Sequence, residues 1–207
     1  MIYMGAGLGV MIGAFFGRYQ LLRWDIWKNW NKVILVIGCF LIFLPGAFLM
    51  NLYGYHVLKI SRSWILMYAL LLLAILDCEK RIIPNRALLV LLGIRMILLV
   101  LDCICFPELW KEVLMSSLGG MIGGGGLFLI AGILARKGMG MGDIKMIAVV
   151  GFYLGFQLLM SDLVISLFLT VLGGIFNLAI RKKPLHSAMP FAPFVAVGTW
   201  ITILLGC

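Results

Sequence analysis

The dominant feature of this sequence is a series of eight long apolar runs, separated by short segments that carry most of the charge. A helix that crosses a bilayer needs about 20 predominantly apolar residues. The runs are continuously apolar rather than alternating, which favours helices over the strands of a membrane barrel. The sequence therefore predicts an all-α, polytopic membrane protein with about eight transmembrane helices. The expected spans are residues 2–17, 33–56, 63–77, 87–105, 113–135, 144–160, 163–180 and 190–206.

The composition excludes a soluble or a disordered protein. Apolar residues make up 64% of the chain and charged residues 12%, with a mean hydropathy of +1.15. A soluble domain carries roughly 25% charged residues, so too little charge is available here to cover a water-facing surface. Because no long polar linker interrupts the runs, we expect one transmembrane domain over residues 1–207, with residues 18–32 as a short cytoplasmic segment. The first run lacks a basic stretch before it and is expected to be a retained helix.

The net charge of +9 bears on orientation, because the bilayer and not a nucleic acid is the expected partner. With the N-terminus outside, thirteen of the seventeen basic residues fall in cytoplasmic segments. The expected outside segments hold three basic residues and three acids, which cancel. This asymmetry predicts a multi-pass protein of the cell membrane with its N-terminus outside. The outside residues are Lys59, Arg62, Lys111, Glu108, Glu112 and Asp162. The cytoplasmic basic residues are Arg18, Arg23, Lys28, Lys32, Lys80, Arg81, Arg86, Arg136, Lys137, Lys145, Arg181, Lys182 and Lys183.

Two aspartates stand at the expected cytoplasmic ends of spans. Asp77 ends the third run and Asp143 precedes the sixth, at similar depth. Two such carboxylates suit three chemistries: an aspartic protease pair, a divalent-cation site or a proton relay. In the first, close carboxylates share one proton, and the pair activates a water for attack on a peptide bond. The structural alternative is that each aspartate only caps a helix.

Three stretches around and beyond these aspartates resemble, in order, the motifs of the type IV prepilin peptidases. The stretch Asp77–Asn85, DCEKRIIPN, resembles the first active-site motif, and Gly140–Lys145, GMGDIK, resembles the G-x-G-D-x-K motif. The stretch Met189–Gly198, MPFAPFVAVG, is similar to the segment that opens the family's last helix. The glycine-rich residues 119–126 fit the helix before G-x-G-D. The resemblance extends over about residues 63–200.

The resemblance implies a membrane aspartic endopeptidase that cuts the basic leader from type IV prepilins or pseudopilins at the cytoplasmic face. Asp77 and Asp143 would be the catalytic pair. The partners would be prepilin substrates and the lipid bilayer, with no cofactor, no metal and no nucleic acid. Structural support of the motifs is expected from Gly140, Gly142, Lys145, Pro84 and Asn85. Two other functions remain open: a small transporter using the aspartates as a cation or proton site, and a non-catalytic pilus-assembly protein.

The five cysteines contain no C-x-x-C pair, so their spacing excludes a tetrathiolate zinc site. The chain therefore resembles the short members of the family, which lack the cysteine-rich cytoplasmic domain. Whether the chain also N-methylates the cleaved product is left open. Arg95 and Asp102 are seven residues apart on one face of the fourth expected span, and we expect them to have a structural role.

Overall fold

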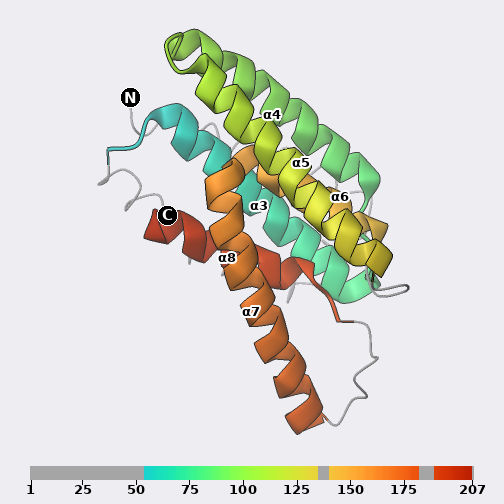
Figure 1. Ribbon diagram of the computed structural model, residues 1–207. Coiled ribbons are helices and arrows are strands. Elements are labelled where there is room, and N and C mark those ends of the chain that lie inside the picture. The colour runs from blue at the N-terminus through green and yellow to red at the C-terminus, as the bar shows by residue number, and fades with distance from the viewer. Residues whose placement is uncertain (1–53, 135–139, 182–188, 207) are drawn as a thin grey trace, which may run out of the picture.

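The computed structural model describes residues 54–134, 140–181 and 189–206, and within these ranges it contains helices and no strands (Figure 1). The all-α prediction is confirmed for this part of the chain. The expected spans 2–17 and most of 33–56, with the segment 18–32, lie outside the described residues. The helices are α3 (Val57–Lys80), α4 (Asn85–Cys105), α5 (Trp110–Leu134), α6 (Met141–Leu154), α7 (Phe156–Arg181) and α8 (Ala192–Leu205).

Four of these helices, α3, α4, α5 and α7, are long and apolar enough to cross a membrane. Together they make the chain a multi-pass membrane protein. Helices α6 and α8 have 14 residues each, which at 1.5 Å per residue is about 21 Å. That length falls short of a hydrocarbon core of roughly 30 Å. These two helices are therefore shorter than the expected spans 144–160 and 190–206.

Several helix boundaries differ from the sequence prediction by a few residues, and the shifts at α3 and α6 move charged residues out of expected loops. Helix α3 begins at Val57, so Lys59 and Arg62 lie in its first turns. Helix α6 ends at Gly155, whose φ of +83° is a conformation that favours glycine. Helix α7 starts immediately afterwards, so Asp162 is inside α7 and fully buried. Because apolar residues flank Gly155 on both sides, hydropathy gave no signal of this break.

Helices α5 and α6 pack closely because glycines face each other across their contact. A Cβ atom added to Gly120 would collide with the backbone carbonyl of Gly151. At Gly124 it would lie 3.1 Å from the Ile147 side chain. Small residues of this kind let helices in membranes approach each other closely. The glycine-rich residues 119–126 thus have a packing role in the structure.

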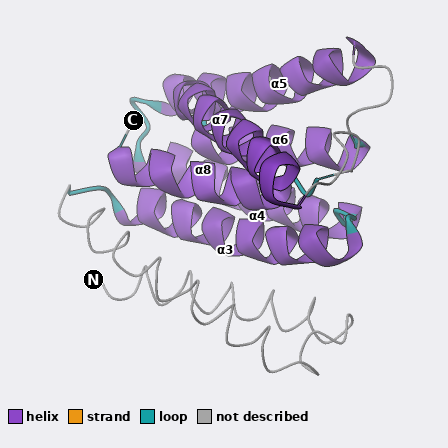
Figure 2. Ribbon diagram, turned by 90° about the horizontal axis from the view of Figure 1, so that it is seen from below, coloured by secondary structure: helices purple, strands orange, loops and turns teal. Residues whose placement is uncertain are grey.

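The apolar core lies where α3, α4, α6 and α8 meet. Leu70, Leu91, Ile147 and Val195 each come from a different one of these helices and are almost entirely buried. Figure 2 shows α3, α4 and α8 running alongside one another, which agrees with the packing of α3 against both neighbours. The result is a bundle in which the ends of several helices come together.

A buried ionic cluster joins α4 to three other helices. Arg95, fully buried, donates from Nη1 to Asp102 Oδ2 at 3.0 Å and from Nη2 to Ser117 Oγ at 2.9 Å. Its Nε donates to the Phe152 carbonyl oxygen at 3.0 Å. Arg62 of α3 approaches the same Asp102 oxygen at 3.5 Å. A charge inside a span is costly unless it is paired, and this one is. The structural role expected for Arg95 and Asp102 is consistent with this network.

Candidate active site

Asp77 lies in the last turn of α3, immediately before the chain reverses. Helix α3 ends at Arg81, a left-handed residue with φ of 52°, whose N–H donates to the Asp77 carbonyl at 3.0 Å. Pro84 then precedes the first residue of α4, Asn85. A proline lacks an N–H and limits the residue before it to extended backbone, so it suits a tight connection between helices. The short loop holds Asp77 at the end of the bundle with 6% of its surface exposed.

Asp143 lies in the first turn of α6. Gly140 precedes the helix in extended conformation, and its backbone hydrogen bonds to the Asp143 carboxylate. An acid that reaches back to the residue before its helix satisfies one of the free N–H groups there. A Cβ atom on Gly140 would lie 3.2 Å from Asp143 Oδ2. Glycine at this position therefore leaves space beside the carboxylate, and Asp143 remains partly exposed.

The two carboxylates are close enough to repel each other. Burial of the side chain, followed by the negative charge of Asp77, raises the pKa of Asp143 to about 6, while the hydrogen bond from Gly140 opposes the rise. Asp143 precedes the apolar part of α6, at the end of the bundle. A carboxyl with this pKa is protonated over a wider pH range than an ordinary aspartate. The pair therefore favours a state with one proton between two carboxylates.

A third helix, α8, also contributes to the site. This contribution was not predicted from the sequence. The backbone N–H of Ala192, the first residue of α8, donates to Asp77 Oδ2 at 3.0 Å. Ala192 is fully buried and Pro193 follows it in the first turn. The N–H groups of a helix's first turn have no partner within the helix and can bind an anion. Helix α8 begins two residues after the expected start at 190, and a backbone donor has no sequence signal.

The residues expected to support the two motifs connect them to each other. Lys145 Nζ donates to Asn85 Oδ1 at 3.1 Å, between α6 and α4. A Cβ atom on Gly142 would lie 3.0 Å from the Ile83 Cβ atom, in the loop that follows Asp77. The structure thus brings all seven expected site residues to one end of the bundle. These contacts join the loop after Asp77 to the start of the helix that carries Asp143.

The arrangement distinguishes the two aspartates chemically. Asp77 accepts a hydrogen bond from a backbone N–H at the start of α8. Asp143 is the member whose pKa is raised, which favours the protonated acid. One carboxylate able to take a proton and one able to give it form a pair suited to general acid–base chemistry. Within the described ranges, no three His, Cys, Asp or Glu side chains gather into a possible metal site.

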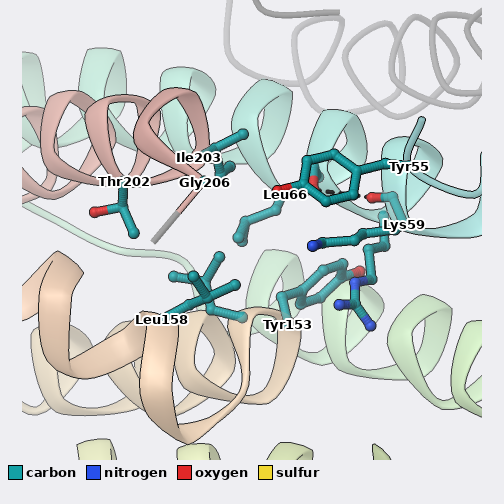
Figure 3. Close-up of a pocket in the computed structure, with 11 residues that line it drawn as sticks. Tyr55, Lys59, Leu66, Tyr153, Leu158, Thr202, Ile203 and Gly206 are labelled. Carbon is teal, nitrogen blue, oxygen red and sulfur yellow. Dashed lines mark hydrogen bonds between the residues drawn. The ribbon is translucent and has the colours of Figure 1, made fainter. Parts of the chain in front are cut away.

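A separate small pocket lies at the opposite end of the bundle (Figure 3). It is lined by Tyr55, Lys59 and Arg62 from the start of α3, and by Thr202 and Gly206 from the end of α8. Asp77 lies at the other end of α3, and Ala192 at the other end of α8. None of the residues predicted from the sequence as site residues lines this pocket.

Comparison with known proteins identifies the class. Residues 64–180 match the model of the type IV leader peptidase family, which covers more than half of the chain. That range contains both aspartates and both motifs. The chain belongs to this family, and the resemblance stated from its motifs is confirmed.

Curated relatives named prepilin leader peptidase/N-methyltransferase support the same assignment. The protein of Pseudomonas putida is 28% identical over 174 residues, 82% of this chain and 57% of its own length. That of Aeromonas hydrophila is 27% identical over 69% of this chain and 48% of its own length. That of Bacillus subtilis is 30% identical over 66% of this chain and 52% of its own length. The chain therefore spans about half the length of these relatives. No solved structure matches it.

Proposed function

We propose that this chain is a membrane-embedded aspartic endopeptidase that removes the basic leader of type IV prepilins or pseudopilins. The observation that carries the proposal is the pairing of Asp77 with Asp143 at one end of the bundle, where the charge of one acts on the other. Both lie in the motifs by which the chain resembles its family, and the relatives are named for prepilin leader cleavage. The single domain over residues 1–207 is part of the same proposal.

The mechanism assigns a different role to each aspartate. The ionised Asp77 takes a proton from a water, and the resulting hydroxide oxygen bonds to the scissile carbonyl carbon. Asp143 gives its proton to the carbonyl oxygen, forming a neutral tetrahedral intermediate. When the C–N bond breaks, the amine leaves with a proton from the pair, and the remaining hydroxyl proton returns to it. Ala192 N–H holds Asp77 in place throughout, and Gly140 leaves room for the substrate backbone beside Asp143.

The proposed site faces the cytoplasm. Four basic residues, Lys80, Arg81, Arg86 and Lys145, surround the end of the bundle that holds the aspartates, and all four are exposed. An excess of basic residues marks cytoplasmic segments of membrane proteins. A prepilin whose apolar helix lies in the same bilayer would present its leader at this depth, which raises the effective concentration of the scissile bond.

Co-expression with the type IV prepilins of the source organism tests the proposal. N-terminal sequencing of the pilin should show removal of the leader by the wild type. Asp77→Asn and Asp143→Asn should leave the leader intact while the protein still inserts into the membrane. Glu79→Gln removes a neighbouring exposed acid and is the matched control, expected to cleave like the wild type. Full cleavage by either aspartate variant would overturn the proposal, as would metal- or proton-coupled transport by a wild type that cleaves no prepilin.

A further inference from the structure

A further buried aspartate, Asp162, has no part in the proposed mechanism. Asp162, in the second turn of α7, has no exposed surface. Its Oδ1 accepts hydrogen bonds from Ser166 Oγ at 3.0 Å and from Thr199 Oγ1 at 3.2 Å. Its Oδ2 has no hydrogen-bond partner among the described residues. Acids inside membrane-spanning helices are costly, so this one requires an explanation.

Helices α7 and α8 lie in close contact beside Asp162. A Cβ atom on Gly198 would collide with Ser166 Oγ and would lie 3.0 Å from Asp162 Oδ1. The backbone of α8 therefore lies directly against these two polar side chains. Thr199, the next residue, donates a hydrogen bond from α8 to Asp162 of α7. A side chain at residue 198 would separate the helices and break it.

Helix α8 connects this contact to the proposed active site. Thr199 follows Ala192 by seven residues, which is two helical turns or about 10 Å along the axis. At its first residue, α8 donates to Asp77 of α3, and two turns later it donates to Asp162 of α7. The helix is thus held by two carboxyl groups from different helices. An apolar contact tolerates sliding and rotation, whereas a hydrogen bond fixes the donor within a few tenths of an ångström.

We propose that Asp162 is a positioning residue, which fixes the rotation and register of α8 through Thr199 so that Ala192 N–H reaches Asp77. This inference rests on the proposed function, because its consequence is measured as peptide cleavage. Asp162 touches neither the water nor the scissile bond. Its effect falls on the chemical step, because Asp77 acts there, and not on binding of the leader.

The experiment compares variants that keep and remove the acceptor and the donor. Asp162→Asn keeps a carbonyl oxygen at the position of Oδ1, whereas Asp162→Leu keeps the branched shape of the side chain, with bulkier methyl groups and no acceptor. Thr199→Ser keeps the hydroxyl, whereas Thr199→Val removes it. Thr170→Val is the matched control, because the Thr170 hydroxyl bonds only within α7, to the Ser166 carbonyl. Each full-length variant is assayed in detergent with a purified prepilin, and kcat and KM are measured separately.

We expect kcat to fall about tenfold in Asp162→Leu and in Thr199→Val, the factor that one hydrogen bond contributes. KM should be unchanged. Asp162→Asn, Thr199→Ser and Thr170→Val should retain wild-type kcat. The double variant Asp162→Leu with Thr199→Val should lose no more than either single variant, because both remove the same contact. If Asp162→Leu fails to fold, the two Thr199 variants and their control carry the test.

A second measurement does not depend on cleavage. Hydrogen exchange of the backbone amides of Ala192, Phe194 and Val195 should be faster in Thr199→Val than in Thr199→Ser or the wild type. Wild-type kcat in both Asp162→Leu and Thr199→Val would overturn the inference, as would equal losses in the conservative and the apolar variants. A wild type that exchanges as expected but cleaves no prepilin would overturn the proposed function and not the attachment of α8.

Discussion

The Asp77–Asp143 pair and the Arg95–Asp102 cluster place buried carboxylates in opposite surroundings. Asp102 faces two guanidinium groups, with Arg95 at 3.0 Å and Arg62 at 3.5 Å from one oxygen. Asp77 faces another carboxylate and accepts a hydrogen bond from the backbone N–H of Ala192. In the first region the carboxylate is attracted to both of its charged neighbours. In the second, burial and then the negative charge of Asp77 raise the pKa of Asp143.

The difference separates groups that hold the fold together from groups suited to chemistry. Every donor nitrogen of the Arg95 side chain has a partner, on α4, α5 or α6. Removing one member of such a network leaves a buried charge without compensation. At the other end, burial and then the charge of Asp77 raise the pKa of the Asp143 carboxyl, and shifted pKa values of this kind are common among the proton donors of active sites. Substitutions at the aspartate pair should therefore affect activity, whereas substitutions in the ionic cluster should affect stability.

The largest expected effect is on activity at the aspartate pair. Asp143→Asn should reduce prepilin cleavage by a factor of about 10³ or more, because the variant cannot donate the proton that the mechanism requires. Its thermal stability should equal or exceed that of the wild type, because like-charge repulsion is removed. Cleavage rates and unfolding temperatures of the purified variant measure both. A variant that is inactive and also strongly destabilised would break the proposed division.

The corresponding change in the ionic cluster should act on stability. Arg95→Met leaves Asp102 buried with only the more distant Arg62, and we expect a loss of roughly 3–5 kcal/mol. The double variant Arg95→Met with Asp102→Leu removes both charges and should recover part of this loss. Unfolding in a graded denaturing detergent compares the three proteins. Equal stability of the single variant and the wild type would contradict the structural role.

The pH dependence of cleavage should report the Asp143 proton. Its pKa is raised to about 6, so the acid is protonated below that pH and loses its proton as the pH rises through it. Cleavage should therefore decline above about pH 6, approaching tenfold per pH unit. The pair titrates as a unit, so the decline belongs to both carboxyls together. A kcat/KM profile measured between about pH 5 and about pH 8, a range that includes this pKa, reports the decline. A rate that rises throughout would show that protonated Asp143 is not the acid.

The smallest effect should come from the contact between Lys145 and Asn85. Both residues are exposed, so Lys145→Met and Asn85→Ala should each cost about 0.5 kcal/mol and reduce kcat a few-fold at most. Because the two changes remove one hydrogen bond, the double variant should resemble each single variant. Loss of all cleavage in Lys145→Met would instead assign that side chain a place in the chemistry.

Much of the fold followed from the apolar runs, since the described helices lie where the spans from residue 63 onward were expected. The motifs also predicted which helix ends converge, because Asp77 ends one run and Asp143 precedes another. The catalytic role of these residues and the single domain over the whole chain stay predictions. What hydropathy could not supply was the break at Gly155, which depends on one backbone torsion inside an apolar stretch.

Backbone partners were the other feature that sequence reasoning missed. The Ala192 N–H at Asp77 and the Phe152 carbonyl at Arg95 belong to residues whose side chains have no polar atom. No pattern of residue types marks such groups, because every residue has them. Asp162 was misplaced for a related reason: an acid between two apolar runs is typical of a loop, and only the helix boundary shows that it is buried.

The pairing within α4 has a consequence for how the protein enters the membrane. Arg95 and Asp102 are two turns apart on one helix and already in contact at 3.0 Å. The apolar part of α4 therefore carries no net charge before any later helix is synthesised. Ser117 and Phe152, which satisfy the remaining nitrogens, are added afterwards, in the order in which the chain emerges. Helix α4 can thus enter the bilayer with its arginine already paired.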